Sequence, residues 1–312
     1  MKVAFLFSGQ VREIPINLFK QSISNLTKEL DYDIFVYAWD EAGKSLNHSK
    51  NNIKKNFYIN PSVYINELFE DFNLKSLQIE NFQLFKENLK PYHKNIFNSK
   101  KYHFGTINAM PQIYMLSQCF GLIKGCLDDY DLIFKCRFDS LFIHPLNLYD
   151  LREIKNKNKI YTLNFGRAYY PNRIYDIFFG GSNDSMKFLS NIWNQLPYLV
   201  NNEFDNKLDK RDACRLLFLS ARLNQIKVES FETRICDVFR NFKNNYYEKY
   251  LLSMHLIRLT KLIKNIYIIP YFYKWFIFRE FNLIKVFFYF LKSLIISPIS
   301  YLKRVKYFFK VS

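Results

Sequence analysis

The chain has 312 residues, of which 49% are hydrophobic and 19% aromatic, and its formal net charge is +17. This length and apolar content exclude an intrinsically disordered chain and suffice for a sizeable core. The charge is uneven, because residues 243–312 hold thirteen Lys and Arg against two acids, whereas residues 1–242 hold 32 basic and 26 acidic side chains. We therefore predict a globular domain over 1–242 and a basic tail over 243–312.

Apolar runs alternate with helical patterns along the first 242 residues. Strands are predicted from "KVAFLF", "YDIFVYAWD", "DLIFKCRF" and "KIYTLNF", at residues 2–7, 32–40, 131–138 and 159–165. Helices are predicted from "INLFKQSISNLTKEL", "NAMPQIYMLSQCFGLIKGCLDDY" and "DKRDACRLLFLSARLNQ", at residues 16–30, 108–130 and 209–225. This alternation predicts an α/β fold, with a mostly parallel sheet that helices cover on both faces.

Three further segments complete the prediction. Residues 41–105 are rich in Asn and Lys and less regular, which indicates an insertion with short helices. "DIFFGGSNDSMKFLSNIWNQL" (176–196) predicts a strand, a Gly-Gly turn and a helix whose N-cap is Ser182 or Asp184. "IKVESFETRICDVFR" (226–240) predicts a final strand and its exit.

The basic tail mixes apolar and aromatic residues with a Lys or Arg every few positions. No stretch reaches roughly 18 uncharged apolar residues, so a membrane-spanning helix is not expected there. Helices that are apolar on one side and basic on the other lie at a membrane interface and are attracted to anionic lipid. We predict a cytoplasmic protein that is peripheral on the inner membrane; the alternative is a helical subdomain that packs on the core and leaves a basic face in water.

Several other classes of protein find little support. The first apolar run is only six residues long, too short for a signal peptide. The five cysteines contain no C-x-x-C pair, which favours reduced thiols over zinc ligands, and the five histidines fall in no catalytic motif. No signature of a nucleic-acid-binding module is present, so we expect no nucleic-acid partner despite the positive charge.

Polar residues follow the first strand, in the segment "SGQVR". Ser8, Gly9, Gln10 and Arg12 offer a hydroxyl, a close approach to the backbone, an amide and a guanidinium. Backbone N–H groups and Arg favour anions, and ligands of parallel sheets bind beyond the carboxyl ends of the strands. The loop could thus hold a nucleotide, although it matches neither a P-loop nor a dinucleotide-binding fingerprint and could be an ordinary strand-to-helix turn.

The segment "FKCRFDS" places Lys135, Arg137 and Asp139 at the end of a predicted core strand. Charged side chains are costly to bury unless they are paired, hydrogen-bonded or bound to a metal. Three interpretations follow: Asp139 binds a divalent cation that bridges diphosphate oxygens, Arg137 pairs with phosphate directly, or Arg137 forms a structural salt bridge with Asp139 or Asp131.

The order of these motifs resembles a known family. "VAFLFSGQVR", "DIFVYAWD", "MPQIYMLSQCFGLI", "YDLIFKCRFDSLF" and "DIFFGGS", in this order, resemble bacterial glycosyltransferases of the WavE-type lipopolysaccharide-synthesis family, which are similar to GT-A enzymes. The resemblance covers roughly residues 1–242 and implies a GT-A-like catalytic domain. Arg137 stands where the usual D-x-D motif would have its first carboxylate, so the need for a metal is left open.

The resemblance also implies roles for individual residues. The donor nucleotide would lie among Ser8, Gly9, Gln10, Arg12, Asn108, Met110, Gln112 and Tyr114. The diphosphate would meet Arg137 and Asp139, with or without a Mn²⁺ or Mg²⁺ ion on Asp139. The acceptor side would be lined by Phe179, Gly180 and Gly181 and closed by Arg240. The catalytic base would come from Glu203, Asp205, Asp209 and Asp212, and we select Asp212 because it opens a predicted helix.

The predicted activity is the transfer of a sugar from a nucleotide-sugar donor to a surface-polysaccharide acceptor, as in capsule or lipooligosaccharide synthesis. The acceptor would be a glycan or lipid-linked, and the tail would hold the enzyme at the membrane. Two alternatives share some of these features: a phosphotransferase that acts on capsular sugars, and a non-catalytic assembly protein of the membrane surface.

Overall fold

The computed structural model describes residues 1–12, 14–41, 60–98, 104–142, 144–146, 148–155, 158–163, 172–201, 212–231 and 236–238. The chain divides into two compact units, Met1–Arg240 and Asn241–Ser312, and every described residue belongs to the first. The last described residue is Val238, so Arg240 and the predicted basic tail lie outside the described residues.

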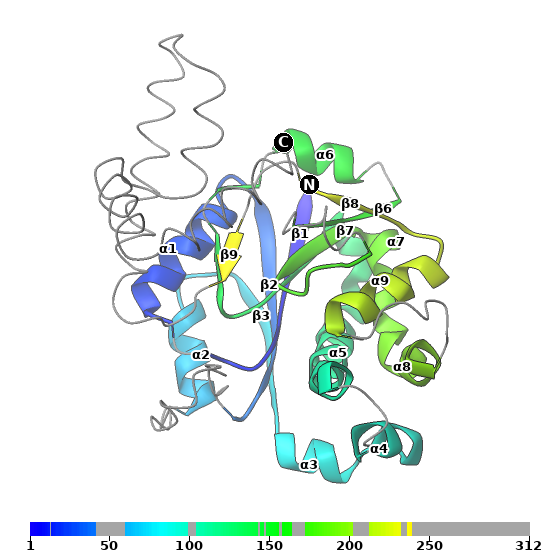
Figure 1. Cartoon of the computed structure of the whole chain (residues 1–312). Helices are drawn as coiled ribbons and strands as arrows, with labels where there is room; N and C mark the ends of the chain where they lie inside the picture. The colour runs from blue at the N-terminus through cyan, green and yellow to red at the C-terminus, as the bar shows by residue number, and fades with distance from the viewer. Residues whose placement is uncertain are drawn as a thin grey trace, which may run out of the picture. The chain divides into compact units, whose positions relative to one another are not determined.

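A seven-stranded sheet in the order β3-β2-β1-β4-β7-β6-β8 forms the centre of the first unit (Figure 1). Its strands are β1 (Lys2–Gly9), β2 (Asp31–Trp39), β3 (Leu74–Glu80), β4 (Leu132–Cys136), β6 (Lys159–Thr162), β7 (Phe178–Ser182) and β8 (Lys227–Ser230). β7 is antiparallel to both of its neighbours, and all the other pairs are parallel. The predicted α/β class with a mostly parallel sheet is thus confirmed.

Helices cover the sheet on both faces: α1 and α2 lie on one side, and α5, α8 and α9 on the other (Figure 1). The described helices are α1 (Ile16–Leu26), α2 (Pro61–Phe69), α3 (Phe82–Glu87), α4 (Pro91–Asn98), α5 (Phe104–Leu122), α6 (Leu148–Lys155), α7 (Asn183–Met186), α8 (Ile192–Asn201) and α9 (Ala213–Leu223), with short 3₁₀ segments at Lys124–Asp129 and Lys187–Asn191. A separate antiparallel pair consists of β5 (Ser140–Phe142) and β9 (Cys236–Val238).

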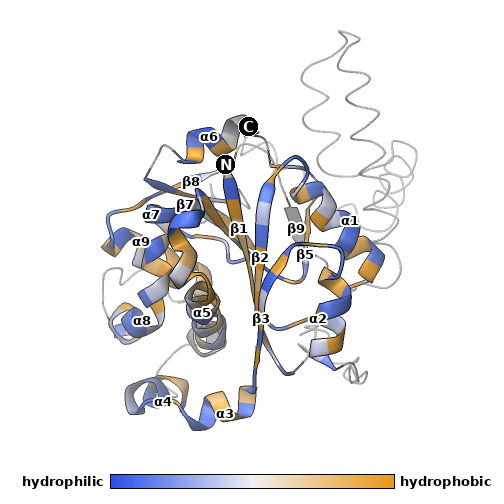
Figure 2. Cartoon of the chain, turned by 180° about the vertical axis from the view of Figure 1, so that it is seen from behind, coloured by the Kyte–Doolittle hydropathy of each residue, from blue (hydrophilic) through white to orange (hydrophobic). Residues whose placement is uncertain are grey.

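The alternation of side chains along β1 explains why both faces need a layer of helices. Phe7 packs its ring against Phe19 of α1 and Phe69 of α2, whereas Ala4 and Leu6 belong to the cluster that includes the buried side of α5. Successive strand residues point to opposite faces, so an apolar run buries both. Figure 2 shows the resulting pattern, with hydrophobic central strands and helices of mixed polarity around them.

Three predicted segments differ in detail from the structure. The segment 41–105 contains β3, an edge strand of the main sheet, in addition to short helices. The predicted Gly-Gly turn is wrong, because Gly180 and Gly181 lie inside β7. The predicted final strand is two short strands, β8 and β9, in different sheets. Ser182 is the N-cap of α7, where its side chain accepts a hydrogen bond from the backbone N–H of Ser185, as predicted.

Among the residues that the structure describes, no helix has the length and apolar character needed to cross a membrane.

Candidate functional site

The strand order reverses direction beside β1. From β1 the chain continues through α1 to β2 and then β3 on one side, whereas β4 pairs with the other edge of β1. In open parallel sheets, ligands bind at such a switch point, outside the carboxyl ends of the two strands. The residues that follow β1 and β4 are therefore those of the candidate site.

The end of β1 combines a glycine of positive φ with an unsatisfied hydroxyl. Gly9 has a φ of +118°, which L-residues rarely adopt, and a Cβ added there would meet no atom within 4 Å. The Ser8 side chain is buried, and its Oγ has no hydrogen-bond partner among the described residues. Such a group is costly to leave unpaired, so the end of β1 offers both an open backbone and a donor for a ligand.

Arg12 connects this loop to the end of β4. Its Nη1 lies 3.0 Å from Oδ2 of Asp139. Gln10, the other predicted polar residue of the loop, is exposed. The structure thus brings together two of the segments that the sequence predicted to share a site, "SGQVR" and "CRFDS".

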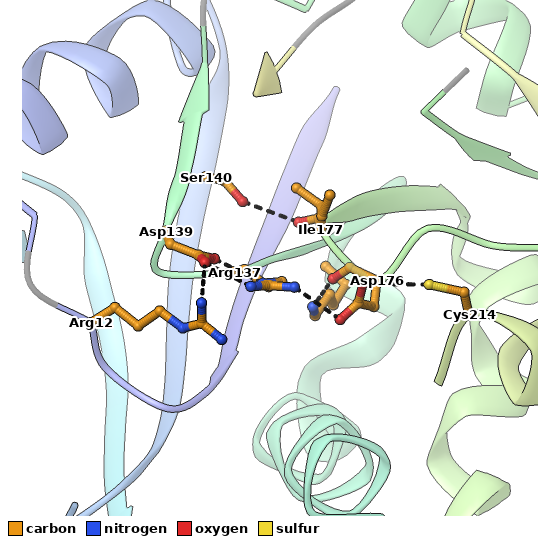
Figure 3. Close-up of polar contacts among 8 residues, drawn as sticks. Arg12, Arg137, Asp139, Ser140, Asp176, Ile177 and Cys214 are labelled. Carbon is orange, nitrogen blue, oxygen red and sulfur yellow. Dashed lines mark hydrogen bonds and ion pairs between the residues drawn. The ribbon is translucent and has the colours of Figure 1, made fainter. Parts of the chain in front are cut away.

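In the turn after β4, the side chain of Arg137 donates two hydrogen bonds to the carboxylate of Asp139 (Figure 3). The Nε of Arg137 donates to Oδ1 of Asp139 at 2.8 Å, and Nη2 donates to Oδ2 at 2.6 Å. The turn is fixed by the backbone, because the N–H of Arg137 donates to the carbonyl of Ile177 and that of Ser140 donates to the carbonyl of Arg137. This paired arrangement is the strong, geometrically specific form of an Arg–carboxylate contact.

Asp176 is a second carboxylate of the site that the sequence analysis did not identify. Its Oδ2 lies 3.2 Å from Nη1 of Arg137, its Oδ1 lies 3.5 Å from Sγ of Cys214, and its carbonyl accepts a hydrogen bond from Nζ of Lys135. Figure 3 shows Arg12, Asp139, Arg137, Asp176 and Cys214 in a continuous series of contacts. Asp176 precedes β7, which is antiparallel to β4, and therefore lies where β4 ends.

The charges of this network determine its protonation states. Burial alone would raise the pKa of Asp139, but Arg137 and then Arg12 outweigh it, and the pKa is lowered. The pKa of Asp176 is lowered in the same way, by Arg137 and Lys135 against burial. Burial lowers the pKa of Lys135 to about 8, although Asp176 opposes this change. At neutral pH three cations therefore face two carboxylates.

The arrangement of donors does not fit a divalent cation on Asp139. Both of its carboxylate oxygens accept hydrogen bonds from guanidinium groups, so a metal ion would compete with Arg12 and Arg137 for them and meet their positive charge. In the part of the chain that the structure describes, no group of three or more His, Cys, Asp or Glu side chains could hold a metal ion. The predicted Mn²⁺ or Mg²⁺ ion stays a prediction.

The predicted residues of α5 have different environments. Gln112 is exposed, and Met110 is fully buried. The hydroxyl of Tyr114 donates to Glu80 at 2.8 Å. Asn108 lies in the first half of α5, and its side chain is outside the described residues. None of these observations brings an α5 side chain into contact with the Arg137 network, so their nucleotide contact stays a prediction.

Asp212 opens α9, as predicted, but both of its oxygens have partners. Oδ1 accepts a hydrogen bond from the backbone N–H of Arg215 at 3.0 Å, and Oδ2 lies 2.9 Å from Nη1 of Arg173. The side chain therefore caps the helix and forms an ion pair. Its predicted role as a catalytic base remains to be tested, and the other candidates, Glu203, Asp205 and Asp209, lie outside the described residues.

The three residues predicted to line the acceptor side are buried in the sheet. Phe179, Gly180 and Gly181 lie in β7 between β4 and β6. A Cβ on Gly180 would lie 2.2 Å from Cδ1 of Phe134, and one on Gly181 would lie 2.4 Å from the carbonyl of Lys159. The glycines allow close strand packing, and all three residues are buried in this structure. Their contact with an acceptor stays a prediction.

No protein-family model matches the chain, and no curated protein sequence matches it either. Among solved structures, the crystal structure of mouse xyloside xylosyltransferase 1 in its apo form matches 74% of this chain and 85% of its own chain, with 10% sequence identity and a TM-score of 0.40. A likeness at this score assigns neither an activity nor a substrate to this chain.

Proposed function

We propose that the protein is a glycosyltransferase that takes its sugar from a nucleotide-sugar donor. The observation that carries the proposal is the Arg12–Asp139–Arg137–Asp176 network, which joins the carboxyl ends of β1 and β4 at the switch point of the sheet. The resemblance of the chain's motifs to those of WavE-type glycosyltransferases supports sugar transfer as the reaction at this site. Membership of that particular family is part of the proposal.

The network has the charge that such a reaction requires. When the bond between the sugar C1 and the diphosphate breaks, its electron pair stays on the diphosphate. The acceptor oxygen forms the new bond to C1, and its hydroxyl proton passes to a general base. Cations held beside the leaving group stabilise the charge that develops there. Arg12 and Arg137 can donate to phosphate oxygens, and Lys135 adds positive charge behind them. Ser8 and Gly9 are proposed to contact the nucleotide from the β1 loop.

A donor screen tests this proposal. The full-length chain is incubated with UDP-, GDP- and CMP-sugars, and the release of the nucleotide is measured with and without MnCl₂. We expect release from one donor class, reduced at least about tenfold by Arg137→Ala, because a cation able to bind phosphate through two hydrogen bonds is lost. Lys28→Ala is the matched control: this basic residue is 68% exposed and precedes β2, at the opposite end of the strands.

The result also separates the alternatives. Transfer of phosphate without turnover of any nucleotide-sugar would favour the phosphotransferase. A chain that neither binds nor turns over any of the donors would contradict the glycosyltransferase and favour the non-catalytic assembly protein.

Membrane association of residues 243–312 is a separate part of the proposal. The excess of Lys and Arg over acids among aromatic and apolar residues supports binding to anionic lipid, which would place a lipid-linked or glycan acceptor of surface polysaccharide within reach. The full-length chain should sediment with vesicles that contain phosphatidylglycerol and remain in solution with neutral phosphatidylcholine vesicles. Equal sedimentation with both would contradict an electrostatic anchor.

A further inference from the structure

The side chains through which the Arg137 network meets solvent are mainly cationic, and the one carboxylate among them is that of Asp176, which is 15% exposed. The side chain of Arg12 is 37% exposed and that of Arg137 is 21% exposed, whereas that of Asp139 is only 2% exposed. The carboxylate of Asp139 is therefore nearly excluded from solvent and lies in contact with both guanidinium groups. A ligand that approaches the end of β4 meets N–H donors before it meets this carboxylate, so the site favours an anion over a metal ion.

Every carboxylate oxygen of the network already has a partner. The two oxygens of Asp139 accept from Arg137, and one of them also pairs with Arg12. The two oxygens of Asp176 pair with Arg137 and with the thiol of Cys214. Divalent cations take several oxygen ligands, and magnesium requires a nearly ideal octahedral shell. A divalent cation would therefore compete with a guanidinium for three of these four oxygens, and with the thiol of Cys214 for the fourth.

The guanidinium of Arg137 is held in place by carboxylates that do not use all of its N–H donors. Two carboxylates fix three of its five N–H donors, at Nε, Nη1 and Nη2, so that among the described residues two N–H groups remain for a ligand. The turn around it is tied to the carbonyl of Ile177 by the backbone N–H of Arg137 and by the hydroxyl of Ser140. A preorganised planar cation of this kind suits bidentate binding of phosphate.

We propose that Arg137 takes the place that a divalent cation would have at this site, and that Arg12 and Arg137 together bind a nucleoside diphosphate without a metal ion. The inference rests on the proposed function, because it concerns how the diphosphate of the donor is recognised. Asp139 and Asp176 are then positioning residues that hold the guanidinium. Arg12 exchanges its contact with Asp139 for one with the diphosphate, and Arg137 remains between the two carboxylates.

Calorimetric titration of the full-length chain with UDP and with GDP tests the inference. Each titration is run in EDTA and again with excess MgCl₂ or MnCl₂. We expect one of the two nucleotides to bind with the same Kd in both conditions, Arg12→Ala and Arg137→Lys each to weaken it about tenfold or more, and Lys28→Ala to leave it unchanged. Arg137→Lys is used here in place of Arg137→Ala, because it keeps a positive charge beside Asp139 and Asp176. The titration can therefore be made even if Arg137→Ala does not fold.

Two results would overturn the inference, and they differ in what they leave standing. Binding that appears only with metal would contradict metal-free recognition but would leave the nucleotide-sugar transferase intact. Absence of UDP and GDP binding in both conditions, together with no turnover of any donor, would remove the proposed function as well.

A reciprocal substitution gives an independent readout. Arg137→Asp places a further carboxylate beside Asp139 and Asp176 and removes the cation between them. We expect MnCl₂ to raise the melting temperature of this variant and to have no such effect on the wild-type chain, because ligands that bind only the folded state stabilise it. A rise of the same size in the wild-type chain would show that a metal binds despite Arg137.

Discussion

Gly180 of β7 allows this strand to approach β4 closely. A Cβ at this position would lie 2.3 Å from the backbone carbonyl of Ile133, and backbone cannot move as a flexible side chain can. We expect Gly180→Ala to lower the free energy of unfolding by about 1–3 kcal/mol, as at other overpacked sites, and therefore to lower the melting temperature.

The matched control for this glycine is Gly121→Ala. Gly121 lies near the end of α5, where an added Cβ would meet no atom within 4 Å, and helices favour Ala over Gly. Thermal unfolding should show this variant at or above the wild type. Equal destabilisation of both variants would contradict the close packing of β4 on β7.

Asp212 is a second residue where structure and catalysis can be separated by substitution. Because its side chain caps α9 and pairs with Arg173, we expect Asp212→Ala to lower the free energy of unfolding by about 1 kcal/mol, and Asp212→Asn to lose less because Asn also caps helices. Urea unfolding measures both. If Asp212→Asn is as stable as expected but has lost nucleotide-sugar turnover, Asp212 is the base; retained turnover would assign that role elsewhere.

The contact between β4 and the segment before β7 carries a pH dependence at the scale of elements. Lys135 of β4 donates to the carbonyl of Asp176, and burial lowers its pKa to about 8 from an ordinary value of 10.5. Between these values the unfolded chain binds more protons than the folded chain, so this group makes stability rise with pH. The groups that act on the charge of Lys135 are Asp176, Arg137, Asp139 and Cys136, and a substitution of Lys135 alone leaves all four in place.

Comparison with Lys135→Met removes the contribution of titrating groups that do not interact with Lys135. Cys119 does interact with it: burial raises the pKa of this thiol, and the charge of Lys135 opposes that change. We expect the wild-type chain to gain stability relative to Lys135→Met as the pH increases from about 8 to 10.5, by up to about 3 kcal/mol. Urea unfolding at several pH values measures the difference. A difference that is constant across this range would show that Lys135 titrates normally.

The elements also explain which parts of the site the sequence could predict. Arg12, Arg137 and Asp139 follow apolar runs that are strands β1 and β4, and the carboxyl ends of adjacent parallel strands lie side by side. Asp176 could not be placed in this way, because the direction of β7 depends on pairing with distant strands. For the same reason the glycines of β7 resembled a turn, although they permit the close approach of β4 and β6.

At the scale of the whole molecule, the sheet converts separate polar segments into one anion site. The loop after β1, the turn after β4 and the start of β7 are far apart in sequence and meet only because β4 pairs with β1 on one edge and with antiparallel β7 on the other. The buried carboxylates hold the guanidinium groups in place, and the guanidinium groups keep the carboxylates ionised. This mutual dependence makes the site preorganised for a ligand with several negative charges.

A crystal structure of the chain with the nucleoside diphosphate that binds it would test this claim most directly. The account predicts that diphosphate oxygens lie within hydrogen-bonding distance of the guanidinium groups of Arg12 and Arg137, at the carboxyl ends of β1 and β4. A diphosphate bound elsewhere on the chain, with the contact between Arg12 and Asp139 intact, would contradict it.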